Sequence, residues 1–120
     1  MISLTLAEVA VAVDGMLTIP AGASADDVVS GTVETDSRLV GAGSVFFALP
    51  GETTDGHLFA ESAVRGGAAV LVVERSLPLE VPQILASDGG TALGRLAQEV
   101  VERVRSTGGL RVIGITGSNG

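Results

Sequence analysis

Short apolar runs that end at glycine or proline alternate along this chain with segments of helical periodicity. Residues 44–49 show this most clearly, because the run is apolar from Val45 onward and stops at Pro50 and Gly51. A continuous apolar run of this length is typical of a strand that is buried on both faces. The other predicted strands are residues 16–19, 28–33, 68–73, 83–86 and 110–116. Strands that alternate with helices predict an α/β fold, in which helices flank a layered sheet that is mixed or largely parallel.

Helix signals fill the intervals between these strands. Residues 5–8 read Thr-Leu-Ala-Glu, the pattern of a capping box, and Gly15 is expected to end the helix that follows. Residues 58–65 predict a second helix. A third helix carries a long apolar stripe, and either Asp88 or Thr91 is expected to cap it.

Composition excludes several classes of protein. Apolar residues make up 46% of the chain and charged residues 18%, which is too apolar and too weakly charged for a disordered segment. No apolar run approaches the roughly 20 residues of a membrane helix, and no basic start precedes an apolar stretch as in a signal peptide. We therefore expect a cytoplasmic protein without membrane insertion.

Charge and residue types narrow the partners. The chain has 14 acidic and 7 basic residues, all of the latter arginine, and its formal net charge is -7. Such a chain repels polyanions, so no nucleic acid is expected as a partner. A bound phosphate would have to be held by backbone N–H groups, hydroxyls or single arginines. Because the chain has no cysteine and a single histidine, we expect no disulfide, no thiolate catalysis and no Cys- or His-based metal site.

The sequence closes with an apolar strand that runs directly into a loop bounded by glycines. The residues of this loop are Thr116, Gly117, Ser118, Asn119 and Gly120. A phosphate-binding loop needs a strand to anchor it, glycines for close approach, and amides that point at the anion. The complete motif continues with Lys and Ser or Thr, and the sequence stops one residue before that Lys. Taken alone, the same residues also describe an ordinary turn.

Two further polar clusters follow predicted strands. Thr35-Asp36-Ser37-Arg38 offers hydroxyls and a guanidinium at a strand end, where α/β sheets bind ligands. The alternative is a turn in which Arg38 pairs with a surface acid. Residues 51–57 read Gly-Glu-Thr-Thr-Asp-Gly-His, which also describes a helix-entry loop with Asp55 as the cap and His57 on the first turn.

Together these clusters resemble the amino-terminal part of the Mur ligases, the ATP-dependent enzymes that lengthen the peptide on UDP-N-acetylmuramic acid. The resemblance runs from Leu4 to the end, and its motifs are residues 36–38, 46–51, 55–57, 67–68 and 115–120, with Val40, Gly43 and Ala63. Residues 4–10, 81–84 and 92–97 resemble those of members that add D-alanyl-D-alanine to the UDP-muramoyl-tripeptide.

The resemblance implies a uridine-nucleotide site. Ser37 would donate to the nucleotide with Thr35 beside it, and Arg38 would orient the turn or the diphosphate. The facing loop would consist of Glu52, Thr53 and Thr54. Glu52 would contact uracil or ribose, because its carboxylate repels a diphosphate. Asp55 and His57 are expected to be architectural.

The resemblance also implies an ATP-dependent ligase that works with ATP and Mg²⁺ through an acyl phosphate, with UDP-MurNAc-peptide as substrate. Residues 116–120 would be the first half of the ATP loop. No catalytic residue or metal ligand is expected in this chain, so the fragment alone should be inactive, bind no cofactor and bind ATP negligibly.

The implied domains are residues 1–86, which bind the uridine nucleotide, and residues 87–120, the first helix and strand of an incomplete central ATP-binding domain. That helix must either lie against the first domain or expose its apolar stripe. The expected partners are the substrate and the downstream central and C-terminal domains. Two alternatives remain: the ligase that adds the third peptide residue, and a non-catalytic nucleotide-sensing module.

Overall fold

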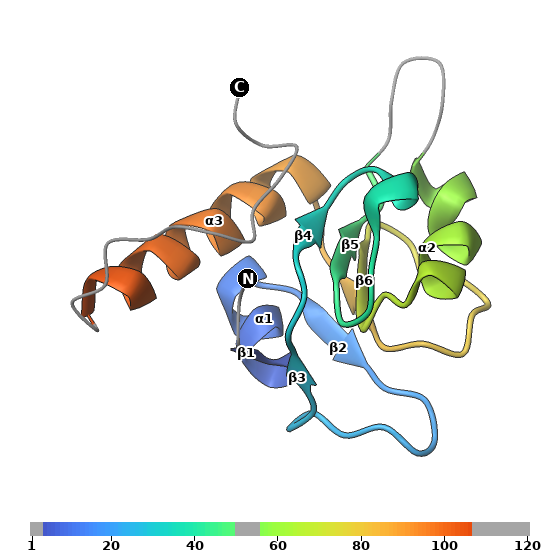
Figure 1. The fold of residues 1–120 in the computed structure, drawn as a ribbon, viewed down its shortest axis with the longest axis horizontal. Coiled ribbons are helices and arrows are strands. Elements are labelled where there is room, and N and C mark those ends of the chain that lie inside the picture. The colour runs from blue at the N-terminus through green and yellow to red at the C-terminus, as the bar shows by residue number, and fades with distance from the viewer. Residues whose placement is uncertain (1–3, 50–55, 107–120) are drawn as a thin grey trace.

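The computed structural model describes residues 4–49 and 56–106 (Figure 1). The strands within these residues are β1 (Leu4–Thr5), β2 (Met16–Thr18), β3 (Val28–Val29), β4 (Val33–Glu34), β5 (Val45–Phe47), β6 (Val70–Val73) and β7 (Gln83–Leu85). The helices are α1 (Leu6–Val13), α2 (Ala60–Gly66) and α3 (Gly89–Ser106), and two 3₁₀ turns are η1 (Ser37–Leu39) and η2 (Gly56–Phe59).

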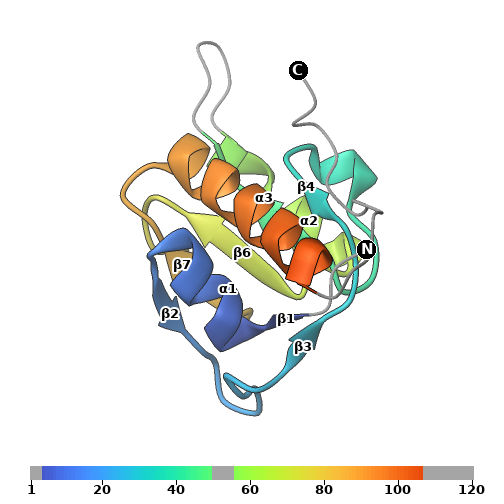
Figure 2. The ribbon, with the colours of Figure 1, turned by 90° about the vertical axis from the view of Figure 1, so that its left-hand side faces the viewer.

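The strands form one five-stranded sheet and one two-stranded ribbon. The sheet has the order β2-β7-β6-β5-β4, in which β4 to β7 are parallel and β2 pairs antiparallel with β7 at one edge. The ribbon pairs β1 with β3. Figures 1 and 2 show α1 and α3 on one face of the sheet and α2 on the other. The predicted α/β fold, with a largely parallel sheet flanked by helices, is confirmed.

Strand β5 shows why its sequence is apolar without alternation. Val45 and Phe47 pack into the core beneath α1 and α3, whereas Phe46 packs into the core beneath α2. Successive side chains of a strand point to opposite faces, so a strand between two helical layers needs an apolar residue at every position. The interpretation of residues 44–49 as a strand buried on both faces is therefore correct.

Helix α1 begins with the predicted capping box. The Thr5 backbone N–H donates to Glu8 Oε1 at 2.8 Å, and the Glu8 N–H donates to Thr5 Oγ1 at 3.1 Å. Its end differs from the prediction, because the left-handed residue that terminates the helix is Asp14, with φ 57°, and not Gly15. Aspartate tolerates this conformation because its short polar side chain can bond locally.

Two predicted elements are divided in the structure. Residues 28–33 form two strands in different sheets, β3 and β4, and not one extended segment. The division falls at Gly31, whose N–H donates to the Gly43 carbonyl at 3.0 Å and whose added Cβ would lie 2.6 Å from the Ser44 nitrogen. This close approach of two backbones requires glycine. Residues 58–65 likewise span the turn η2 and the helix α2, and are not one helix.

Helix α3 is capped by Asp88, since the Thr91 N–H donates to Asp88 Oδ2 at 2.8 Å. It lies beside α1 on the same face of the sheet (Figure 2). Its residues Ala92, Leu96 and Val100 are buried in the core that α1 and β5 also build. Through these three residues, α3 packs against the preceding elements. The predicted strand 110–116 lies outside the described residues. Among the helices that the structure describes, none has the length and apolar character to cross a membrane.

Candidate functional site

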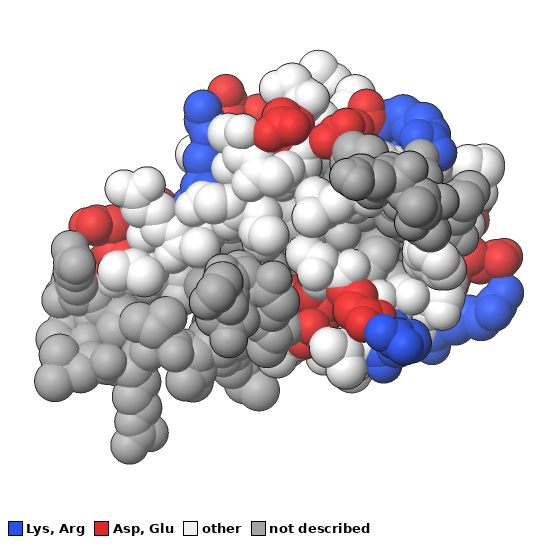
Figure 3. Space-filling view, turned by 90° about the horizontal axis from the view of Figure 1, so that it is seen from above, with Lys and Arg blue, Asp and Glu red and all other residues white. Residues whose placement is uncertain are grey.

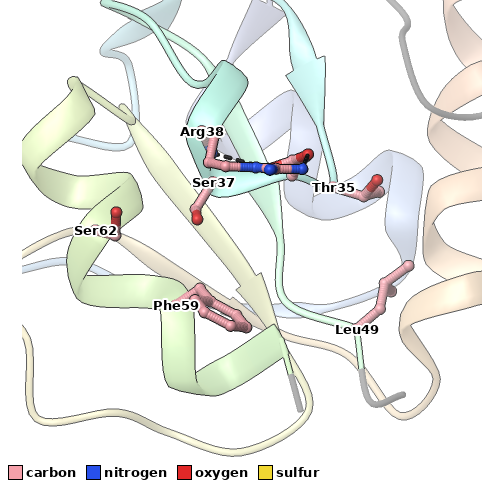
Figure 4. A pocket seen from close by; sticks show the side chains of 7 residues that line it. Thr35, Ser37, Arg38, Leu49, Phe59 and Ser62 are labelled. Atoms are coloured by element: carbon pink, nitrogen blue, oxygen red, sulfur yellow. Dashed lines mark hydrogen bonds and ion pairs between the residues drawn. The ribbon is translucent and has the colours of Figure 1, made fainter. Parts of the chain in front are cut away.

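An open pocket lies where the parallel strands β4 and β5 end, and its volume is about 660 Å³. Its lining residues are Thr35, Asp36, Ser37, Arg38, Leu49, Phe59 and Ser62 (Figure 4). The first four follow β4, Leu49 follows β5, and the other two come from η2 and α2. Parallel α/β sheets bind ligands in the crevice beyond the carboxyl ends of their strands. The sequence-predicted residues Thr35, Ser37 and Arg38 therefore meet in one pocket of the expected kind.

The polar wall of the pocket is built around an ion pair. The Arg38 backbone N–H and Nε donate to Asp36 Oδ1 at 2.9 and 3.0 Å, and Nη2 donates to Asp36 Oδ2 at 2.7 Å. The hydrogen bonds from the Arg38 side chain and backbone lower the pKa of Asp36 from 3.8 to about 2. The pairing of Arg38 with a surface acid, one of the two sequence interpretations, is thus present. The Arg38 side chain is still 85% exposed, so its charge also faces the solvent at the pocket.

The opposite side of the pocket is apolar and was not found from the sequence. Phe59 is 45% exposed, although Phe46 and Phe47 are both completely buried. Figure 4 shows the Phe59 ring across the pocket from the Arg38 turn, with Leu49 at the other end of the same side. The sequence carried no signal for this wall, because an apolar residue near a helix start is equally consistent with a core position. A flat ring facing hydroxyls and a guanidinium suits a ligand with one planar and one anionic part.

His57 has an architectural position, as the sequence analysis expected. Its side chain is buried, and its Nε2 accepts a hydrogen bond from the Glu74 backbone N–H at 2.9 Å. Because this nitrogen is an acceptor, it carries no proton in this arrangement. The bond fixes η2, and with it Phe59, to the end of strand β6.

The remaining predicted site residues lie outside the described part of the chain. Glu52, Thr53, Thr54 and Asp55 lie between β5 and η2 in the sequence, and the predicted ATP-binding residues are 116–120. Within residues 4–49 and 56–106, no group of three or more His, Asp or Glu side chains could hold a metal ion. Seen from above, the arginines on the visible described surface lie beside acidic residues, and uncharged surface separates these mixed groups (Figure 3).

Comparison with known proteins places this chain in a family. A model described as the catalytic domain of the Mur ligase family matches residues 31–105. The UDP-N-acetylmuramoyl-tripeptide–D-alanyl-D-alanine ligase of Mycobacterium bovis is 41% identical over an alignment of 140 positions, which covers 100% of this chain and 27% of the relative. The UDP-N-acetylmuramoyl-L-alanyl-D-glutamate–2,6-diaminopimelate ligase of Geobacillus kaustophilus is 50% identical over 88 residues, 73% of this chain and 18% of the relative.

Solved structures give the same result. The crystal structure of MurF from Acinetobacter baumannii aligns with a TM-score of 0.72 and 30% sequence identity, over 86% of this chain and 22% of that one. The chain thus spans only 18% to 27% of the length of the two curated relatives. The family model covers residues 31–105, more than half of the sequence, and the chain therefore belongs to the Mur ligase family.

Proposed function

We propose that this chain is the substrate-anchoring part of an ATP-dependent ligase that adds D-alanyl-D-alanine to UDP-MurNAc-tripeptide in the cytoplasm. The observation that carries this proposal is the pocket at the ends of β4 and β5, in which Thr35, Ser37 and Arg38 converge. The Mycobacterium bovis relative, which aligns with 100% of the chain, has a name stating this activity, and this supports the assignment within the family.

In this proposal the pocket holds the uridine nucleotide. The hydroxyls of Thr35 and Ser37 bond to the nucleotide, and the exposed Arg38 guanidinium attracts the diphosphate. Thr53 and Thr54 also contact the nucleotide in this proposal, and Glu52 contacts uracil or ribose. A net charge of -7 disfavours long polyanions, yet a single arginine and nearby donors suffice for one diphosphate.

The chemistry belongs to the whole enzyme. When bound to the whole enzyme, ATP with Mg²⁺ would supply the phosphoryl group that activates the substrate carboxylate. The metal would neutralise the negative charge of the phosphoryl group during its transfer. Residues 116–120 form the start of the ATP loop in this proposal, and residues 87–120 begin the central domain. The groups that act on the substrate lie in the downstream domains, so this chain alone anchors the substrate and does not catalyse.

The second candidate is the ligase that adds the third peptide residue. The 50% identity to the diaminopimelate ligase of Geobacillus kaustophilus over 88 residues favours it, although that match leaves part of the chain unaligned. Both candidates bind a UDP-MurNAc-peptide, so they share the proposed pocket and differ in the amine that the downstream domains accept. An assay of the whole enzyme with D-alanyl-D-alanine and with 2,6-diaminopimelate separates them.

The proposed site is tested by titrating the chain with UDP-N-acetylmuramic acid while recording amide NMR spectra. We expect shifts at residues 35–38 and 51–54. Ser37→Ala should weaken binding about two- to tenfold, because one hydroxyl hydrogen bond contributes about 0.5–1.5 kcal/mol.

The matched control is Thr18→Ala, which removes an exposed hydroxyl from the opposite edge of the sheet and should leave the affinity unchanged. Addition of RNA should shift no signals. Perturbations confined to residues 88–120, with residues 35–38 and 51–54 silent, would show that the pocket is not the uridine site.

A further inference from the structure

Glu74, which immediately follows strand β6, is bonded through its backbone to the turn η2, which lines the pocket, and through its side chain to the start of helix α3. Its backbone N–H donates to His57 Nε2 at 2.9 Å, and His57 belongs to the turn η2 that carries Phe59. Its carboxylate Oε2 accepts the N–H of Gly89 at 2.6 Å. Gly89 is the first residue of α3. A single residue therefore connects η2 to the start of a long helix.

The start of α3 in turn touches the other apolar wall of the pocket. A Cβ atom added at Gly89 would lie 2.6 Å from Leu49 Cδ2 and 3.2 Å from Glu74 Oε2. Gly89 is also buried, so Leu49 packs directly against the helix start without room for another atom. Leu49 and Phe59 are the apolar walls of the pocket. Leu49 lies against Gly89, and Phe59 lies in the same turn as His57, so each wall adjoins a residue that Glu74 binds.

We propose that Glu74 is a positioning residue that sets the spacing between Leu49 and Phe59, and hence the width of the pocket. Its carboxylate is well placed for this, because a negative charge at a helix N-terminus is attracted to the unpaired N–H groups and to the helix dipole. The effect of Glu74 on the spacing between Leu49 and Phe59 is inferred from its two hydrogen bonds alone. Its effect on ligand affinity rests on the proposed function, binding of a uridine nucleotide.

Asp88 provides a matched control at the same helix end. Its carboxylate also stabilises the start of α3, but it accepts bonds from the Thr91 N–H at 2.8 Å and the Thr91 hydroxyl at 2.6 Å, both within the helix. Loss of either Glu74 or Asp88 therefore removes an acceptor from the first turn of α3. Of these two acids, Glu74 is the one that also bonds to η2.

The experiment compares Glu74→Ala, Glu74→Gln and Asp88→Ala in the full chain. Glu74→Ala retains the backbone N–H that binds His57 and removes only the bond to Gly89. We expect it to shift the Leu49 methyl and Phe59 ring signals in NMR spectra without ligand, and to weaken UDP binding about two- to tenfold, the range for one lost hydrogen bond. Glu74→Gln retains a carbonyl oxygen that can accept the Gly89 N–H. In this variant the Leu49 and Phe59 signals should therefore keep the positions that they have in the unaltered chain. Asp88→Ala should not move the Leu49 and Phe59 signals.

A second pair of variants tests the hydrogen bond between the Glu74 backbone N–H and His57. His57→Ala removes the acceptor for the Glu74 N–H, whereas His57→Gln offers an amide oxygen at a similar distance from the backbone. We expect the Phe59 signals to move in the first variant and to return toward their original positions in the second. Because the chain has one histidine, its ring ¹⁵N signals are unambiguous, and in the unaltered chain they should show Nε2 without a proton.

The proposal is overturned if Glu74→Ala leaves Leu49 and Phe59 unmoved, or if Asp88→Ala moves them equally. These readouts need no ligand, so they hold even if UDP does not bind. Failure of UDP to bind the unaltered chain would count against the proposed function instead. Normal UDP binding with an unchanged affinity in Glu74→Ala would contradict the role of this spacing in recognition.

Discussion

The Asp36–Arg38 pair has a measurable signature at the level of one residue. The pKa of Asp36 is about 2 in the folded chain, below its ordinary value of 3.8, because the Arg38 side chain and backbone donate to its carboxylate. The contribution of the pair to the stability of the fold is therefore fully present above about pH 3.8, and it is lost as the pH falls through about 2. We expect a ¹³C titration of the Asp36 carboxyl to have a midpoint near 2 in the unaltered chain.

Arg38→Gln should return that midpoint toward 3.8, since it removes the side-chain donors. Arg65→Gln is the matched control, because it removes an arginine whose partner is Glu61 on α2. A midpoint near 3.8 in the unaltered chain would show that the pair does not form in solution.

Phe59 is the pocket residue for which we predict an effect on recognition without an equal effect on folding. Because its side chain is 45% exposed, Phe59→Leu should change the free energy of unfolding little. Aromatic stacking contributes about 0.5–1.5 kcal/mol, so UDP binding should weaken about two- to tenfold. The upfield NMR shift that a ring induces in uracil protons should vanish with the ring. Leu39→Ala, at an exposed apolar residue outside the pocket lining, should alter neither quantity.

At the scale of elements, replacement of Gly67 and replacement of Gly94 by alanine should have opposite effects on the stability of the chain. Gly67 ends α2 with φ 108°, and an added Cβ would lie 2.9 Å from the Ala42 Cα. Gly67→Ala should therefore destabilise the chain by about 1–3 kcal/mol. Gly94 lies within α3 with open space around it, so Gly94→Ala should stabilise by about 0.5–1 kcal/mol. Thermal unfolding followed by circular dichroism measures both, and equal effects would contradict this distinction.

Elements whose causes are local could be predicted from the sequence. The capping box of α1 depends on two side chains three residues apart, and the strand β5 on an unbroken apolar run, so both were found. The division of residues 28–33 was not found, because it arises where Gly31 meets Gly43 from another segment. The candidate site likewise has one part that could be predicted from the sequence and one part that could not. Ser37 and Arg38 lie in one motif, whereas Phe59 joins them only through the placement of η2.

At the scale of the whole molecule, α3 decides whether the chain behaves as one unit. The sequence places a domain division at about residue 87, which assigns α3 to the following domain. In the structure, the buried side chains of α3 share a core with α1, β5 and β6, and Arg103 of α3 pairs with Glu8 of α1 at 3.1 Å. An exposed ion pair contributes little, so the shared apolar core has to supply the coupling between α3 and the sheet.

Leu96→Ala tests that coupling, because Leu96 of α3 is completely buried in the shared core. Removing a buried leucine side chain costs about 2–5 kcal/mol. If the chain unfolds as one unit, the loss should appear equally in the amide hydrogen exchange of α3, α1 and β6. Far-UV circular dichroism is the suitable optical probe, since the chain lacks Trp and Tyr. Val11→Ala, at a position 81% exposed on α1, is the control and should change stability by no more than about 0.5 kcal/mol. Faster exchange confined to α3 would mean that this helix is an independent unit and that the chain divides near residue 87.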